Sequence, residues 1–108
     1  MLNKKLKELS KDIAEEMKTR FDSDFDTANK ILTEYLTKYD YLNSDRIIRC
    51  VIFLANNGIE SFKSVLESAK GDPRDVMWWA EYENQESFDN NKRVRDFNKT
   101  FSENNIKH

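Results

Sequence analysis

The segment from Asp45 to Ala55 is the most apolar part of the chain and constrains the fold more than any other. At about 100° per residue, its apolar side chains cover an arc of about 200°, which is wider than the apolar stripe of a surface helix. These side chains are Ile47, Ile48, Cys50, Val51, Ile52, Leu54 and Ala55. Ser44 is a suitable N-cap, and residues 56–58 (Asn-Asn-Gly) tolerate the positive φ at which a helix ends. We therefore predict a central, almost fully buried helix.

Helical spacing of apolar residues continues on both sides of this segment. Spacings of three and four residues predict a helix of roughly twenty residues that ends at Phe21, a second from Phe25 to Tyr39, and a fourth from Ile59 to Ala69. The first of these helices carries the apolar stripe Leu2, Leu6, Leu9, Ile13, Met17 and Phe21.

A fifth helix is predicted from Pro73 to about Glu83. Asp72 can cap it, and proline fits the first helical position, where its missing N–H costs nothing. The chain has only two glycines and one proline in 108 residues, so it has few of the residues that form tight hairpin turns. We therefore predict an all-α fold, a compact bundle of five helices.

The composition changes after Glu83. Residues 84–108 are rich in Asn, Lys, Glu and Ser, and only Val94, Phe97 and Phe101 keep helical spacing. We predict a helical bundle domain over residues 1–83, followed by a polar C-terminal segment over 84–108 that is partly helical or flexible, with a weak helix around 92–101.

The net charge of −2 hides an uneven distribution. Residues 1–20 carry six basic and four acidic side chains, residues 21–83 carry seven and twelve, and residues 84–108 carry five and four. An acidic body favours basic partners and makes nucleic acid an unlikely one. The single cysteine excludes an internal disulfide, and no apolar run is long enough to span a membrane. The charged N-terminus does not resemble a signal peptide, so we expect a cytoplasmic protein.

Residues for catalysis are scarce. The single histidine is His108, which nothing would orient, and Cys50 lies among apolar neighbours as a buried, inert thiol. Acidic residues alone can hold magnesium when Glu pairs at one-turn spacing on two helices are followed by Glu and Asp four residues apart. That pattern is not met by Glu15 and Glu16, nor by Glu60 and Glu67, which lack the second pair. We therefore predict no enzymatic activity, no cofactor and no metal site, with a carboxylate-metal hydrolase as the least favoured function.

A group of aromatic and charged residues forms the predicted partner-binding surface. It comprises Arg46, Arg49 and Phe53 on the central helix and Arg74, Trp78, Glu81 and Tyr82 on the Pro73 helix. Arg, Trp and Tyr dominate binding hot spots. A structural role is favoured, with Arg74 over Trp78 as a cation–π pair and Arg46 or Arg49 forming an ion pair with Asp75 or Glu81. The two roles can coexist.

The segments RIIRCVIFLA and DPRDVMWWAEYE together resemble a pattern of short uncharacterised bacterial proteins of about this size. The resemblance covers residues 44–83. It implies a compact bacterial helical domain and transfers no activity.

The leading hypothesis is a non-enzymatic helical module that binds another protein through an acidic, aromatic-bearing surface, as a small inhibitor, immunity protein or regulator does. The alternative is a helical nucleic-acid-binding regulator that uses its basic terminal segments, including Lys92, Arg93, Arg95 and Lys99. A homodimer formed through the first helix or the C-terminal segment fits either function.

Overall fold

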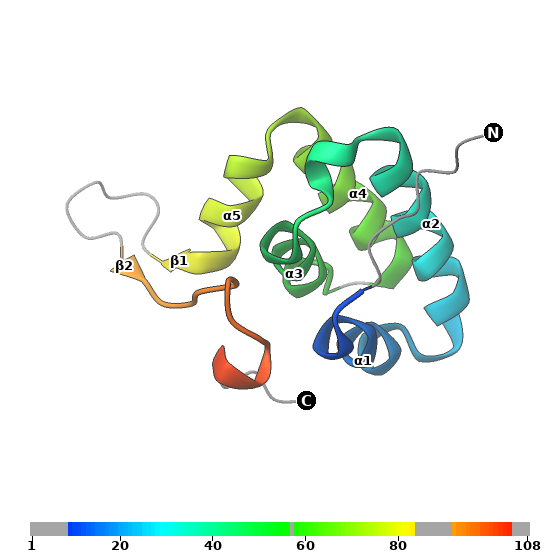
Figure 1. The fold of residues 1–108 in the computed structure, drawn as a ribbon, viewed down its shortest axis with the longest axis horizontal. Helices are drawn as coiled ribbons and strands as arrows, with labels where there is room; N and C mark the ends of the chain where they lie inside the picture. The colour runs from blue at the N-terminus through cyan, green and yellow to red at the C-terminus, as the bar shows by residue number, and fades with distance from the viewer. Residues whose placement is uncertain (1–8, 57, 84–91, 105–108) are drawn as a thin grey trace.

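Helix α3 (Asp45–Leu54) lies at the centre of the structure, as its apolar sequence predicts (Figure 1). The computed structural model describes residues 9–56, 58–83 and 92–104. The helices that surround α3 are α1 (Lys11–Phe21), α2 (Phe25–Lys38), α4 (Gly58–Gly71) and α5 (Pro73–Glu81). Every residue of α3 from Ile47 to Ile52 is buried. The all-α fold class is confirmed.

The hydrophobic core draws side chains from each of these helices and from the C-terminal segment. Ile13 and Met17 of α1, Phe62 of α4 and Val76 of α5 are all fully buried. The rings of Phe21 and Phe62 meet with their centroids 4.9 Å apart, which joins the end of α1 to α4. Burial of each such side chain contributes about 1.5–3 kcal/mol to folding, so this core holds the helices together.

Helix α1 begins at Lys11, later than the apolar spacing predicts. Leu9 and Ser10 lie before the helix, while Leu2 and Leu6 fall outside the described residues. The Ser10 hydroxyl donates to Asp45 Oδ2 at 2.7 Å. This bond turns Ser10 toward the start of α3 instead of into a longer α1.

The other helix ends follow their local signals closely. Asp72 caps α5, because its side chain accepts from the backbone N–H of Arg74, and Gly58 has a φ of +76° at the start of α4. Ser44 occupies the N-cap position of α3, although its side chain makes no capping bond. Asn57, part of the predicted stop signal, lies outside the described residues.

Helix α5 ends at Glu81, two residues earlier than predicted, because the chain then enters a short strand. Strand β1 (Tyr82–Glu83) pairs antiparallel with β2 (Lys92–Arg93). The pairing brings Tyr82 opposite Arg93. It returns the chain from α5 toward the bundle.

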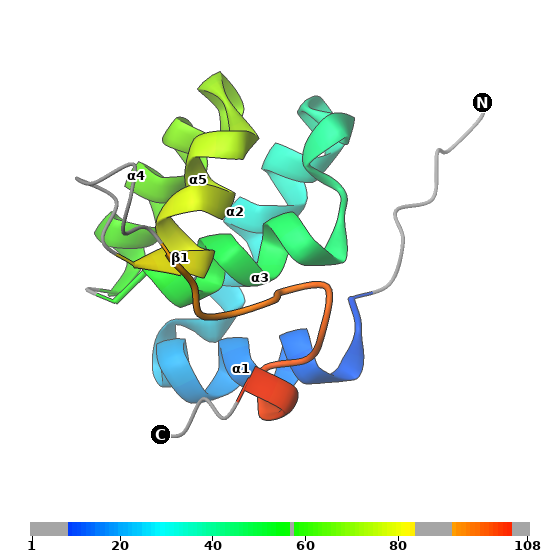
Figure 2. The ribbon, with the colours of Figure 1, turned by 90° about the vertical axis from the view of Figure 1, so that its left-hand side faces the viewer.

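Residues 92–104 form a strap that packs against the bundle, and the helix predicted around 92–101 is wrong. After β2 the strap runs through turns to a short 3₁₀ helix, η3 (Ser102–Asn104). Figure 2 shows it crossing below α3 to reach α1. Phe97 and Phe101 are 0% and 3% exposed. Their spacing matches a helix, but they enter the core from an irregular segment.

Candidate functional site

Two of the residues predicted on the partner-binding surface are buried instead. Glu81 is 0% exposed and Arg49 is 6% exposed. Burial of a charged group is costly unless it is paired and hydrogen-bonded. Both residues meet that condition, so the expectation that they lie on the surface is wrong.

The Glu81 carboxylate is the centre of an ionic cluster that joins α3, α5 and the strap. Arg46 donates to it through Nε at 3.0 Å and Nη2 at 2.5 Å. Arg93 Nη2 donates at 3.3 Å, and the backbone N–H of Phe97 donates at 2.9 Å. The hydrogen bond to Glu81 raises the pKa of Arg46 above its ordinary value. The predicted ion pair between the central helix and the Pro73 helix is therefore confirmed as Arg46–Glu81.

Arg49 also attaches the strap to the helices, through contacts with Asp12 and Phe97. Its Nε and Nη2 bind the two oxygens of Asp12 at 2.9 and 3.0 Å, and its Nη1 donates to the Phe97 carbonyl at 3.0 Å. The hydrogen bond to Asp12 raises the pKa of Arg49. Asp12 also accepts from the backbone N–H of Phe101 at 3.3 Å. Arg49 thus connects α1, α3 and the strap.

Phe53 is half-buried beneath the strap. Its ring centroid lies 5.3 Å from that of Phe97, and the guanidinium groups of Arg95 and Arg20 lie 4.5 and 5.8 Å from the Phe53 ring. Such cation–π contacts stabilise the packing of a partly exposed ring. Phe53 therefore serves to hold the strap.

The remaining predicted residues are Arg74 and Trp78 of α5 and Tyr82 at the start of β1. Together with Trp79 of α5, they define what we call the α5 face. Trp78 stacks on Tyr82 with centroids 4.5 Å apart and ring planes at 24°. Arg74 pairs with Asp72 at 3.0 Å, a hydrogen bond that raises the pKa of Arg74.

Trp79 is 43% exposed and was not among the predicted site residues. Trp78, its neighbour, is half-buried. The aromatic pair at positions 78 and 79 is visible in the sequence, but a helical wheel without a known packing direction does not show which indole faces outward.

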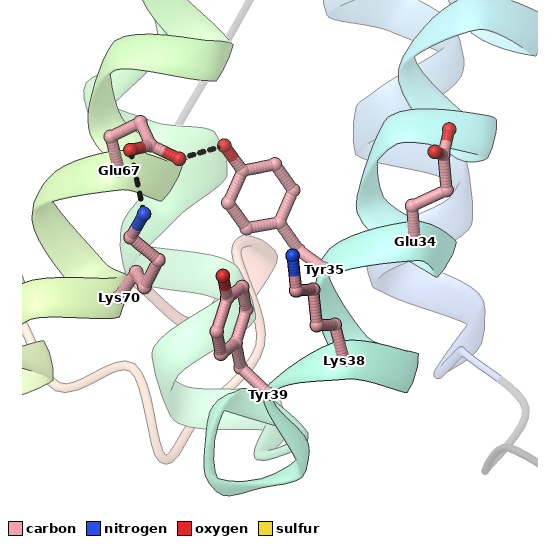
Figure 3. Close-up of a pocket in the computed structure, with 6 residues that line it drawn as sticks. All are labelled: Glu34, Tyr35, Lys38, Tyr39, Glu67 and Lys70. Carbon is pink, nitrogen blue, oxygen red and sulfur yellow. Dashed lines mark hydrogen bonds and ion pairs between the residues drawn. The ribbon is translucent and has the colours of Figure 1, made fainter.

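A groove between α2 and α4 is a second candidate site, with a volume of about 290 Å³ (Figure 3). Its lining, which defines the α2–α4 groove, is Glu34, Tyr35, Lys38, Tyr39, Glu67 and Lys70. The Tyr35 hydroxyl donates to Glu67, and Lys70 Nζ lies 3.0 Å from the same carboxylate. The ammonium groups of Lys38 and Lys70 lie 5.6 and 5.7 Å from the centroid of the Tyr39 ring.

The sequence identified the tyrosines of the groove only as core or rim aromatics. Tyr35 and Tyr39 are half-buried, and Tyr41 is 51% exposed. The one-turn spacing of Tyr35 and Tyr39 is visible in the sequence, but their meeting with Glu67 and Lys70 depends on how α2 and α4 pack.

Alkaline titration of Tyr35→Phe tests the contact between Tyr35 and Glu67. The hydrogen bond to Glu67 raises the pKa of Tyr35 from 10.0 to about 12. The folded state therefore retains this proton more tightly than the unfolded state, so the stabilising effect is complete below about pH 10 and is lost as the pH rises from about 10 to about 12.

We expect the tyrosinate absorbance of folded Tyr35→Phe to lack a step near pH 12 that the wild type shows. Its stability should also fall less steeply over the same pH range. Retention of the step near pH 12 in the Tyr35→Phe variant would show that Tyr35 is not held by Glu67.

The thiol of Cys50 is buried in the core. Burial raises the pKa of the Cys50 thiol, so it stays protonated and unreactive, as predicted. Within the described ranges, no cluster of three or more His, Cys, Asp or Glu side chains is arranged to hold a metal ion. None of the helices in these ranges has the length and apolar character needed to cross a lipid bilayer. His108 lies outside them.

Comparisons of the chain with protein-family models, with curated proteins and with solved structures give no match. The α5 face and the α2–α4 groove are therefore interpreted from their own chemistry.

Proposed function

We propose that this protein is a non-enzymatic helical module that binds another protein through the α5 face, in the manner of a small inhibitor, immunity protein or regulator. The observation that carries the proposal is the exposed indole of Trp79, at 43%, on the same helix as Trp78, whose ring stacks on Tyr82 at the start of β1. Trp, Tyr and Arg are the residue types that dominate binding hot spots. Exposed and half-buried aromatic rings of this kind gain free energy when a partner buries them.

The charge around the α5 face supports a partner with a neutral or basic surface. Asp72 and Arg74 neutralise each other as an ion pair, while Asp75 is exposed nearby. Residues 21–83 carry seven basic and twelve acidic side chains. Complementary charge on a partner would steer its approach and speed association.

The alternative is nucleic-acid binding through the basic N- and C-terminal segments. The contacts of the arginines in the strap give it less support. Arg93 binds Glu81 and Asp96, and Arg95 Nε donates to the Ala80 carbonyl at 2.6 Å. These guanidinium groups are used to attach the strap, which leaves them less available to phosphates. A gel shift with mixed DNA and RNA that weakens with added salt would favour this alternative.

Replacement of Trp79 by alanine tests the proposal. We expect the affinity for the partner to fall about thirtyfold, which corresponds to the loss of about 2 kcal/mol at a hot spot. The free energy of unfolding should fall by only about 1–2 kcal/mol, because the side chain is partly exposed. The measurement is quantitative pull-down with wild-type and variant baits, followed by calorimetry on the proteins captured.

Lys30→Ala is the matched control, since Lys30 is exposed on α2, away from α5 (Figure 1). It should retain every partner at full affinity. Retention of every partner by Trp79→Ala as well would refute the proposed face. Light scattering that finds a wild-type dimer and a Trp79→Ala monomer would identify the partner as a second copy of the chain.

A further inference from the structure

We propose that the α2–α4 groove binds a small organic acid, with its carboxylate between Lys38 and Lys70 and its apolar body along Tyr35 and Ile31. This site is separate from the α5 face, and the inference does not depend on the proposed function.

Three hydrogen-bond donors converge on the groove. The ammonium groups of Lys38 and Lys70 lie within 5.7 Å of the Tyr39 ring centroid, and Figure 3 shows the Tyr39 hydroxyl pointing into the same space. In the part of the chain that the structure describes, no carboxylate pairs with Lys38 and no acceptor binds the Tyr39 hydroxyl. A carboxylate ligand would supply an acceptor for Lys38 and the Tyr39 hydroxyl, and would share Lys70 with Glu67.

The groove is held in shape before any ligand arrives. Glu67 binds both the Tyr35 hydroxyl and Lys70, and the hydrogen bond to Glu67 raises the pKa of Lys70. The Tyr41 hydroxyl donates to the Lys70 carbonyl at 2.6 Å, which fixes the last turn of α4. Preorganised donors lower the entropic cost of binding.

The lining holds two lysines and two glutamates, so an anion is favoured only at the end of the groove where the ammonium groups lie. Glu67 neutralises one of the two ammonium groups, while Glu34 points away from them in Figure 3. Lys38 is therefore the ammonium group that, among the described residues, has no carboxylate in direct contact at this end of the groove, although Glu67 also attracts it over a longer distance. A carboxylate matches it, whereas a cation would meet the ammonium groups.

The groove continues along α2 beyond the charged end. A second hollow of about 190 Å³ is lined by Ile31, Glu34, Tyr35 and Lys63, and it shares Glu34 and Tyr35 with the first. Ligand pockets generally measure about 300–1,000 Å³, so this groove fits only a small molecule. Its shape suits an acid with a short apolar body.

The test is a nuclear magnetic resonance titration of the protein with 3-phenylpropionate, compared with 3-phenylpropylammonium. We expect the acid to shift amide signals of α2 and α4 around the groove, and the ammonium compound to leave them unchanged. Lys38→Met should weaken binding of the acid about tenfold, because it keeps the length of the side chain but removes the charge. Tyr39→Phe should weaken binding by a smaller factor through loss of the hydroxyl.

Lys30→Met, on the exposed surface of α2 outside the groove, is the control and should bind the acid as the wild type does. The spectra also report whether each variant is folded. The proposal is overturned if the acid causes no shifts in the groove, if the ammonium compound binds equally well, or if Lys38→Met binds as tightly as Lys30→Met.

Discussion

Phe97→Ala is expected to lower the free energy of unfolding by about 4 kcal/mol, within the range measured for Phe removed from a core. The ring is 0% exposed and packs between Phe53 and Phe101, with centroid distances of 5.3 and 5.6 Å. Alanine would leave a cavity between the strap and α3. Since a domain of this size has a stability of about 5–15 kcal/mol, the variant should be close to unfolding.

Urea denaturation followed by tryptophan fluorescence measures this effect. Lys99→Ala is the matched control, because Lys99 is exposed on the same strap and its replacement should cost less than about 0.5 kcal/mol. A loss below about 1 kcal/mol for Phe97→Ala would contradict the packing of the strap in the core.

Glu81→Ala is expected to lower the free energy of unfolding by about 3 kcal/mol. The substitution leaves the buried N–H of Phe97 without its acceptor and removes the carboxylate between Arg46 and Arg93. Breaking a buried ion pair costs about 3–5 kcal/mol. The two arginines are 33% and 39% exposed and regain some hydration, so the lower end of that range applies.

Glu81→Gln separates charge from hydrogen bonding in this cluster. Glutamine keeps an oxygen for the Phe97 N–H but loses the negative charge, so we expect an intermediate cost of about 1–2 kcal/mol. Glu60→Ala, whose side chain is 89% exposed, is the surface control and should have almost no effect. Equal unfolding midpoints for Glu81→Ala and Glu60→Ala would show that the cluster does not stabilise the fold.

A variant that combines Glu81→Ala with Phe97→Ala tests whether the two sites act together. Each single substitution weakens the attachment of the strap. The second substitution should therefore lower the free energy of unfolding by less when the first is already present. Simple additivity of the two losses would indicate that the ionic cluster and the Phe97 ring hold separate parts of the structure.

The helices were predictable from the sequence because their signals are local. Apolar spacing identified α2, α3 and α4, and the Asp72 cap with Pro73 placed the start of α5. The central position of α3 followed from the width of its apolar arc. In each case the residues that decide the structure are within a few turns of one another.

The strap was not predictable as such, because its deciding contacts are distant in sequence. Phe97 binds Arg49 across 48 residues, and Phe101 binds Asp12 across 89. The spacing of the two phenylalanines alone favours a helix. For the same reason Arg49 and Glu81 were expected on the surface, since a charged residue indicates burial only when its partner is known.

The candidate sites were only partly visible in the sequence. The aromatic composition of α5 identified the α5 face, but the choice between Trp78 and Trp79 required the packing direction of the helix. The α2–α4 groove was not identified, because its residues come from two helices whose alignment no local pattern specifies.

The attachment of the strap also determines the order in which the nascent chain completes its fold. Asp12 leaves the ribosome early, yet its bond to Phe101 forms only after 89 further residues have been made. Until then the rings of Phe97 and Phe101 are missing from the core, and the sides of α1 and α3 that they cover are open to water. Closing so long a loop is entropically costly and slows the final step. In the cell, α1 to α5 therefore pass through a stage with exposed apolar surface, which is when chaperones would engage the chain.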